Sequence, residues 1–338
     1  MNLRSSLQQL FDTKTLFSSS FLMENLDKVL DILQNEDESF RPRENCKNNF
    51  SGGLLDFRKK ENLPVVVIPD LHARGKFFLD ILDFNLEIEN QTISVLEALL
   101  QNKIYLVSLG DLFHSEIRGC ERWKTAFVKI IESNDFLNDE LCEEMQENLN
   151  LLMMCIQLKL NCPQNFHILK GNHENILNEE GNGNHPFYKF AAEGDMVYSF
   201  LQKKYDDALI YLISSFEHSL PLCAVFPDVI LSHAEPEIPL DANQIIDFRD
   251  NYDVCLGLTW TRNDCANQTS VSKTIKSIYK KNYRDVVWIA GHRPVIGNYA
   301  LRQKGKFIQI HNPLKENIAI ICPQKKFNPD EDIFNVEK

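Results

Sequence analysis

The chain has 338 residues, of which 43% are hydrophobic and 25% are charged, so it is long enough to bury a sizeable core. A formal net charge of −12, with no long cluster of Lys and Arg, argues against binding to long nucleic acid, because such a surface repels polyanions. Nine cysteines without a CxxC pair indicate reduced core thiols. Since the sequence lacks a signal peptide and an apolar run of the ~18 residues that a membrane span requires, we expect a cytoplasmic protein without a membrane segment.

Residues 1–62 are expected to form an N-terminal helical extension. Hydrophobic residues at helical spacing predict an amphipathic helix through 21–33, and a polar, Asn-rich segment follows at 35–51. From 63 to 322, short β-branched runs alternate with helical stretches, which indicates one layered α/β domain. Residues 323–338 are polar and acidic, and we expect them to form a C-terminal tail.

The expected strands are short, and most are apolar at nearly every position, as is typical of strands buried on both faces. They cover residues 65–68, 104–107, 166–169, 224–226, 229–231, 286–290, 307–310 and 318–321. Pro227-Asp228 predicts a turn that joins the fourth and fifth of these strands into a hairpin. We expect helices at 75–83 and 93–100, and a pair of long helices within 121–160.

Polar residues that can bind a metal ion follow five of these expected strands. The segments are Pro69-Asp70-Leu71-His72, Leu109-Gly110-Asp111, Lys170-Gly171-Asn172-His173-Glu174, Leu231-Ser232-His233 and Ala290-Gly291-His292. The ligand crevice of an open α/β sheet lies beyond the carboxyl ends of its strands, so five segments would deliver oxygen and imidazole groups to one edge. Asp70 or Asn172 alone would more often be a turn residue, but together with three histidines they predict a metal site.

In this order, the five motifs resemble those of the calcineurin-like metallophosphoesterase superfamily, over roughly residues 64–322. The resemblance implies a layered β-sandwich flanked by helices. The last motif, Gly291-His292-Arg293-Pro294, lacks the second histidine that many members place two residues later. The stretch Leu258-Thr259-Trp260-Thr261-Arg262 is similar to a Leu-x-Trp-x-Arg stretch of bacterial relatives. Both features make the resemblance closest to the phosphoprotein-phosphatase branch and its bacterial relatives.

The resemblance also implies two divalent metal ions. The ligands that it implies are Asp70 and His72 for the first ion, Asn172, His233 and His292 for the second, and Asp111 as a bridge between them. A carboxylate between two dications ~3.5–4 Å apart offsets their repulsion. The mixed nitrogen and oxygen set suits Mn²⁺, Fe or Zn²⁺ better than Ca²⁺, and the absence of a cysteine ligand argues against a purely structural zinc site.

The reaction that the resemblance implies is hydrolysis of a phosphate monoester, on a phosphoprotein or a small phosphometabolite, by a metal-bridged hydroxide. His173 would protonate the leaving-group oxygen as a general acid. Arg262 could hold two phosphoryl oxygens with its planar guanidinium. Arg74, Arg118 and Arg293 are further candidates for substrate binding. A surface ion pair is the alternative interpretation of all four arginines.

One motif departs from the resemblance. The phosphatase branch usually has Gly-Asp-x-x-Asp-Arg-Gly where this chain has Gly110-Asp111-Leu112-Phe113-His114-Ser115-Glu116. His114 therefore stands where the related phosphatases place an aspartate that orients the general-acid histidine, and we count it as a catalytic candidate, with a core histidine as the alternative. Glu116 and Glu235 are candidates for a carboxylate partner of His173. Structural or solvent roles are expected for His167, His185, His218 and His311.

Two other functions remain open at this point. The first is phosphoanhydride or phosphodiester cleavage, such as dinucleoside-polyphosphate hydrolysis, because the same metal pair serves these reactions. The second is a catalytically silent, metal-stabilised binding module whose N-terminal extension recruits partners. The complete ligand set argues against the silent module, whereas the missing aspartate and arginine argue for it. The sequence predicts a phosphorylated substrate and identifies no protein partner.

Overall fold

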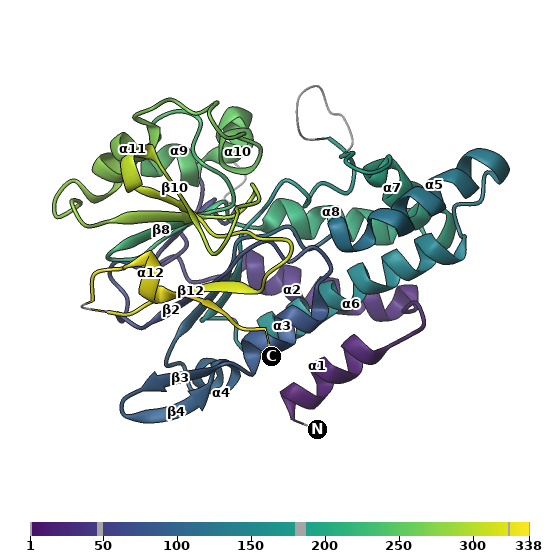
Figure 1. Cartoon of the computed structure of the whole chain (residues 1–338), viewed down its shortest axis with the longest axis horizontal. Helices are drawn as coiled ribbons and strands as arrows, with labels where there is room; N and C mark the ends of the chain where they lie inside the picture. The colour runs from purple at the N-terminus through teal and green to yellow at the C-terminus, as the bar shows by residue number, and fades with distance from the viewer. Residues whose placement is uncertain (1, 46–49, 180–186, 324, 338) are drawn as a thin grey trace.

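Two β-sheets packed face to face form the centre of the protein (Figure 1), in a computed structural model that describes residues 2–45, 50–179, 187–323 and 325–337. A six-stranded sheet has the strand order β1-β7-β8-β9-β11-β10, and a five-stranded sheet has the order β13-β12-β2-β5-β6. Helices cover the outer faces of both sheets. The expected layered β-sandwich flanked by helices is confirmed.

Short strands build both sheets. The six-stranded sheet contains β1 (Leu54–Asp56), β7 (Cys223–Val225), β8 (Val229–Ser232), β9 (Val287–Ala290), β10 (Ala300–Arg302) and β11 (Phe307–Gln309). The five-stranded sheet contains β2 (Val65–Ile68), β5 (Tyr105–Ser108), β6 (Phe166–Ile168), β12 (Asn317–Ile321) and β13 (Ile333–Asn335). A separate hairpin contains β3 (Asn85–Ile88) and β4 (Gln91–Ser94). Every strand that we expected is present, and β7 pairs with β8 as the expected antiparallel hairpin.

Side chains of the central strands alternate between two cores. In β2, Val65 and Val67 lie in the core between the sheets, whereas Val66 and Ile68 lie in the core beneath the helices. All four side chains are at most 2% exposed. Because successive residues of a strand point to opposite faces, a strand covered on both sides requires an apolar residue at each position.

Two groups of helices flank the sandwich. The group beside the five-stranded sheet contains α1 (Leu3–Asp12), α2 (Ser19–Gln34), α3 (Gly75–Leu82), α4 (Val95–Leu100), α5 (Cys120–Ser133), α6 (Asp139–Asn161), α7 (Glu193–Lys204) and α8 (Asp207–Ser219). The group over the six-stranded sheet contains α9 (Ala242–Ile246), α10 (Tyr252–Thr259) and α11 (Ser270–Tyr279). A short helix, α12 (Pro329–Asp332), precedes β13. The expected pair of long helices is present as α5 and α6.

Both ends of the chain contribute to the sheets. Strand β1 falls within the segment 1–62 that we expected to be an extension, and it pairs in parallel with β7. Strand β13 falls within the segment 323–338 that we expected to be a tail, and it pairs antiparallel with β12. Leu7 of α1 and Leu22 of α2 are fully buried in the helical core. Leu54-Leu55 and Ile333-Phe334 are apolar runs of two residues, shorter than the runs that marked most of the expected strands, so neither strand was expected.

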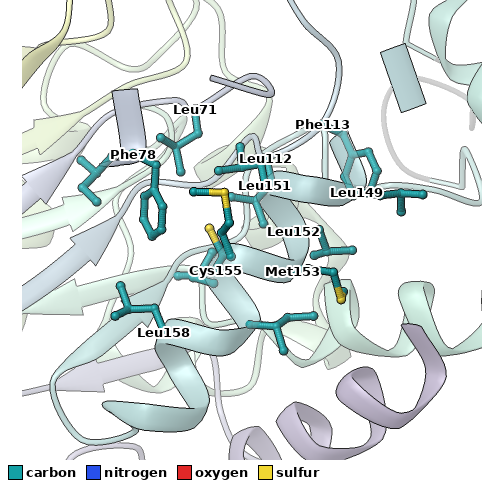
Figure 2. Close-up of a cluster of buried hydrophobic side chains, with 14 of the residues drawn as sticks. Leu71, Phe78, Leu112, Phe113, Leu149, Leu151, Leu152, Met153, Cys155 and Leu158 are labelled. Atoms are coloured by element: carbon teal, nitrogen blue, oxygen red, sulfur yellow. The ribbon is translucent and has the colours of Figure 1, made fainter. Parts of the chain in front are cut away.

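Buried residues of helix α6 pack against the loops that follow β2 and β5 (Figure 2). Leu71, Leu112 and Phe113 belong to those loops, and they lie in the same buried cluster as Leu149 and Leu152 of α6. Each of the three loop residues is adjacent to a candidate site residue. Exposing a side chain of this size to water costs roughly 1.5–3 kcal/mol, so these apolar anchors hold the polar residues between them in place.

Neither a membrane span nor a disulfide is found in the described part of the chain. No helix there combines the length and the apolar character needed to cross a bilayer. The eight described cysteines are free thiols, and the ninth, Cys46, lies outside the described residues.

Candidate metal centre

The six expected metal ligands lie together at one edge of the sandwich, beyond the carboxyl ends of five strands. Asp70 and His72 follow β2, Asp111 follows β5, Asn172 follows β6, His233 follows β8 and His292 follows β9. Strands β2, β5 and β6 run parallel, as do β8 and β9, so their carboxyl ends meet at the same edge within each sheet. Five of the six residues are at most 3% exposed, and His292 is partly buried.

Three of these ligands converge on one point. Asn172 Oδ1 lies 2.9 Å from His233 Nε2 and 2.9 Å from His292 Nδ1, and the two ring nitrogens are 3.2 Å apart. Metal bonds of ~2.0–2.2 Å hold neighbouring ligand atoms about 3 Å apart, so this triangle has the dimensions of a metal coordination shell. His233 Nδ1 donates to Leu109 O at 2.9 Å, which leaves Nε2 available to a metal ion.

The other half of the centre contains His72 with two carboxylates. His72 Nε2 lies 3.9 Å from Asp70 Oδ2 and 3.6 Å from Asp111 Oδ2. Its Nδ1 donates to His114 O at 3.0 Å, so Nε2 is again the free ligand atom. Asp111 Oδ2 also lies 3.4 Å from His233 Nε2. Asp111 therefore stands between the two halves, in the position that a bridging carboxylate requires.

Two glycines of the motifs allow the backbone to approach the carboxylates closely. A Cβ atom on Gly291 would lie 1.8 Å from Asp70 Oδ1, and one on Gly171 would lie 2.2 Å from Asp111 Oδ1. With glycine at 291, the next amide, His292 N, donates to both carboxylate oxygens of Asp70, at 3.1 and 2.9 Å. Any larger residue at either position would displace a ligand carboxylate.

Glu174 joins the loops that follow β5 and β6. Its carboxylate accepts hydrogen bonds from the backbone amides of Asp111 at 2.8 Å, Leu112 at 2.7 Å and Gly171 at 2.7 Å. The side chain is 1% exposed, and the three amides compensate its removal from water. This arrangement explains the glutamate of the Gly-Asn-His-Glu motif as a positioning residue.

The electrostatics of the centre favour a bound cation. Burial raises the pKa of Asp111 well above its usual range, and the neighbouring charges of Asp70 and Glu174 raise it further. Burial lowers the pKa of His233 to about 4. Burial, with the neighbouring His233, lowers the pKa of His292 well below its usual range. Neutral imidazoles bind metal ions, and carboxylates crowded in this way are stabilised by added positive charge, so these residues fit a metal ion.

Three of the ligands adopt left-handed backbone conformations. The φ angles are 45° at His72, 53° at Asp111 and 62° at His292. Such conformations cost a non-glycine residue roughly 1–3 kcal/mol each, and they persist where the surrounding structure determines them. The strained backbone of the loops after β2, β5 and β9 therefore lowers the stability of the protein, and it sets the direction in which these side chains point.

A cavity of about 340 Å³ opens onto the ligands. Its walls include three aromatic residues and three cationic residues, namely Phe187, Tyr188, Trp260, Lys189, Arg262 and Arg293. The Arg262 side chain is exposed and forms no ion pair with the described residues. Sequence analysis did not identify Lys189, because it lies in a loop without periodicity and only the fold brings it to the cavity.

Two arginines that we considered as substrate ligands lie elsewhere. The Arg74 guanidinium donates to four backbone carbonyls, those of Asp70, Leu71, Asn312 and Lys315. Arg118 pairs with Glu147 at 2.6 Å. Both arginines line a different cavity of about 900 Å³, between the N-terminal helical segment and α6. The structure therefore does not bring Arg74 or Arg118 to the cavity at the ligands.

His173 lies in the wall of the smaller cavity, beside Asp111. Its Nε2 is 3.7 Å from Asp111 Oδ2, and its Nδ1 is 2.8 Å from His114 Nδ1. Burial, with nearby His72 and His114, lowers the pKa of His173 well below its usual range. Burial lowers the pKa of His114 to about 3. The two histidines therefore form a neutral, hydrogen-bonded pair.

Neither candidate glutamate is hydrogen-bonded to His173. Glu116 accepts from Lys189 Nζ at 2.7 Å and from His311 Nε2 at 2.8 Å. Glu235, in the loop after β8, accepts from Arg302 and Gln303. Sequence analysis chose Glu116 and Glu235 because they lie close to the motifs in the sequence. Closeness in sequence does not specify the direction in which a side chain points.

His311 is a further residue at the centre, to which sequence analysis gave no chemical role. It follows β11 with one residue, Ile310, between them, and its side chain is completely buried. Its position after an expected strand is the same signal that identified the six candidate ligands. His167 and His218 lie away from the centre, in contact with Lys159 and Ser214, and His185 lies outside the described residues.

Comparisons with solved structures and with protein families concern the fold and the family of this chain. A protein serine/threonine phosphatase from Saccharomyces cerevisiae, with similarity to human phosphatase PP5, superposes with a TM-score of 0.55 at 13% identity, over 94% of this chain and 89% of that chain. A putative diadenosine tetraphosphatase superposes with a TM-score of 0.38 at 13% identity, over 84% and 97%. No curated protein matches the sequence significantly. The sequence matches the calcineurin-like phosphoesterase family over residues 63–315, which include all six expected ligands, and the chain therefore belongs to that family.

Proposed function

We propose that this protein is a dinuclear metal-dependent phosphatase that hydrolyses phosphate monoesters. The observation that carries the proposal is the position of Asp111 Oδ2, 3.6 Å from His72 Nε2 on one side and 3.4 Å from His233 Nε2 on the other. Asp70 and His72 would hold one ion, and Asn172, His233 and His292 the other. Mn²⁺, Fe or Zn²⁺ suits this mixture of imidazole and oxygen ligands.

When bound, the metal ions supply activation of the attacking water and neutralise charge on the phosphoryl oxygens. The remaining tasks belong to side chains of the cavity. Arg262 can donate two parallel hydrogen bonds to phosphoryl oxygens, since its guanidinium is not engaged by a carboxylate of the described chain. Lys189 supplies a second positive charge on the cavity wall. Phe187 and Trp260 reduce access of bulk water to the reacting group.

His173 would assist departure of the leaving group through Nε2. In the contact between the two Nδ1 atoms, one nitrogen must donate the proton and the other must accept it. His114 Nε2 is buried without a hydrogen-bond partner in the described structure, and a buried acceptor without a partner is more common than a buried N–H without one. His114 Nδ1 is therefore the donor, which leaves the proton of His173 on Nε2, the nitrogen that faces Asp111.

The dimensions of the cavity support a small phosphorylated group as substrate. A volume of about 340 Å³ is at the lower end of the range for ligand pockets, roughly 300–1,000 Å³. The phosphorylated side chain of a protein, or a small phosphometabolite, fits this volume better than both halves of a dinucleoside polyphosphate. The phosphorylated residue would lie against Trp260 and Arg262 at the cavity wall.

A panel of substrates tests the proposal. We expect the protein loaded with Mn²⁺, Fe or Zn²⁺ to hydrolyse p-nitrophenyl phosphate faster than bis(p-nitrophenyl) phosphate or diadenosine tetraphosphate, and to lose activity on chelation. Asp70→Asn, purified in parallel, controls for a contaminating phosphatase. Trace metal occupancy after loading would contradict the metal-dependent mechanism. Faster hydrolysis of diadenosine tetraphosphate would contradict the monoester assignment and favour phosphoanhydride cleavage.

A further inference from the structure

His311 approaches the metal centre from a strand that none of the five motifs includes. Strand β11 runs parallel to β9, so its carboxyl end reaches the same edge of the six-stranded sheet as His292. The backbone on both sides of His311 is fixed, because Ile310 N donates to Ala290 O at 3.0 Å and Val295 N donates to His311 O at 2.9 Å. The side chain is 0% exposed. Its position is therefore as well determined as that of the expected ligands.

The two ring nitrogens of His311 have different environments. Nε2 lies 2.8 Å from Glu116 Oε2, a carboxylate that can only accept when ionised, so Nε2 carries the proton. Nδ1 is then a lone pair, buried and without a hydrogen-bond partner in the described structure. It lies 3.8 Å from Asp70 Oδ2. Asp70, His72 and His311 each offer one ligand atom, and these three atoms all lie within 4.8 Å of one another.

We propose that His311 Nδ1 is a ligand of the metal ion held by Asp70 and His72, and that Glu116 orients His311 for this role. The inference rests on the proposed function in requiring an ion at that position. A carboxylate that accepts the outer N–H of an imidazole is the common support of a metal-bound histidine, because it fixes the tautomer and increases the basicity of the inner nitrogen. The pair formed by Glu116 and His311 has this arrangement.

Glu116 itself is the competing ligand, since its Oε2 lies 3.7 Å from His72 Nε2. Both of its oxygens are already engaged, Oε1 by Lys189 Nζ at 2.7 Å and Oε2 by His311 at 2.8 Å. Coordination by Glu116 would use a second lone pair of an oxygen that already accepts a hydrogen bond, and it would leave His311 Nδ1 buried without a partner. Coordination by His311 satisfies Nδ1 and keeps both contacts of Glu116.

A second imidazole changes the metal preference of the first site. With Asp70, Asp111 and His72 alone, the protein would offer that ion two carboxylates and one nitrogen. His311 raises the number of nitrogens to two, and imidazole ligands favour Fe and Zn²⁺ over Mg²⁺. The contact between Glu116 and Lys189 also connects this support to a cation of the cavity wall.

Metal analysis of three variants tests the inference without relying on activity. Wild type, His311→Ala, Glu116→Gln and His167→Ala are loaded with Mn²⁺ and dialysed. Bound metal is then counted by mass spectrometry, and the paired ions are followed by the exchange-coupled EPR signal. His167→Ala is the matched control, because it removes another imidazole that is 1% exposed, away from the centre. Circular dichroism of each variant checks folding.

We expect His311→Ala to lose the coupled signal and to retain the second ion, with first-site affinity reduced at least 100-fold. Glu116→Gln should weaken the first site by about 10- to 100-fold, as removal of an outer-shell partner does, and it decides the question if His311→Ala fails to fold. Equal metal content in His311→Ala and wild type overturns the inference while the proposed function stands. Loss of first-site metal in Glu116→Gln, with full occupancy in His311→Ala, assigns the ligand to Glu116 and also overturns it. Absence of metal from wild type overturns the proposed function itself.

Discussion

His114 and His173 face each other with their Nδ1 atoms 2.8 Å apart, so the candidate general acid is supported by a neutral imidazole. A carboxylate in that place would stabilise the imidazolium form of His173, whereas a neutral histidine stabilises only one tautomer. Neutral His173 can donate a hydrogen bond through Nε2, but it is a much weaker acid than an imidazolium. We therefore expect the enzyme to favour substrates whose leaving groups need little protonation.

His114→Asp tests this relationship. The aspartate would raise the pKa of His173, so the protonated form would persist to higher pH, and the rate would fall only as the pH rises through the raised pKa. We expect kcat for phenyl phosphate, a poor leaving group, to increase by several-fold, with little change for p-nitrophenyl phosphate. Rates for both substrates across pH 4–9 measure the effect. An equal change for both leaving groups would show that His114 does not act through His173.

Asp111→Asn should weaken metal binding in both halves of the centre. An amide carries no charge to offset the repulsion of two cations, and it offers one oxygen to replace the carboxylate oxygen that faces His72 and His233. We expect metal content, measured after dialysis, to fall from about two ions towards none. Asp264→Asn, at an exposed carboxylate outside the cavity lining, is the control. Selective loss of one ion would mean that Asp111 does not bridge.

Arg262→Ala should impair catalysis and leave metal binding unchanged. The guanidinium lies on the substrate side of the cavity, and loss of a charge-assisted contact in the transition state reduces kcat/KM by about 10- to 100-fold. Arg284→Ala is the matched control, because Arg284 is exposed and precedes β9, at the end of the sheet away from the ligands. Unchanged kcat/KM with p-nitrophenyl phosphate would assign Arg262 a structural role.

Gly291→Ala should displace Asp70. The added Cβ would lie 1.8 Å from Asp70 Oδ1, so the carboxylate or the backbone must move, and we expect weaker metal binding in the half that contains His72. Gly257→Ala, within α10, is the control, since its Cβ would meet Glu237 at an ordinary 3.5 Å. Thermal unfolding distinguishes a local from a global effect. Wild-type metal affinity in Gly291→Ala would show that Asp70 is not required there.

The positions of the six candidate metal ligands illustrate what local sequence patterns can predict. An apolar run such as Val65-Val66-Val67-Ile68 marks a strand buried on both faces, and a polar residue after it lies at the carboxyl end of that strand. Because parallel strands bring these ends to one edge, the order of the motifs was sufficient to predict which side chains meet. Short strands without such runs, β1 and β13, were not recognised.

Contacts between segments far apart in the sequence could not be predicted from these local patterns. Arg74 and Arg118 were considered as substrate ligands from their proximity to the motifs, yet one supports backbone carbonyls and the other pairs with Glu147 on α6. Lys189 reaches the cavity through its ion pair with Glu116, which is 73 residues away in the chain. Which cation faces the ligands depends on how loops and helices pack.

The sequence by itself determined the layered fold and the set of candidate ligands at the strand ends, since both follow from apolar runs along single strands and from the direction of parallel strands. Only the tertiary structure decided the partners of the residues at and around the centre. In the folded chain, His173 contacts His114, Glu116 accepts a hydrogen bond from His311, and the backbone of Gly291 lies against the Asp70 carboxylate. The physical reason is that the hydrogen-bond partner of a side chain depends on the direction of that side chain and on packing across the whole core. Periodicity along one segment carries no information about either.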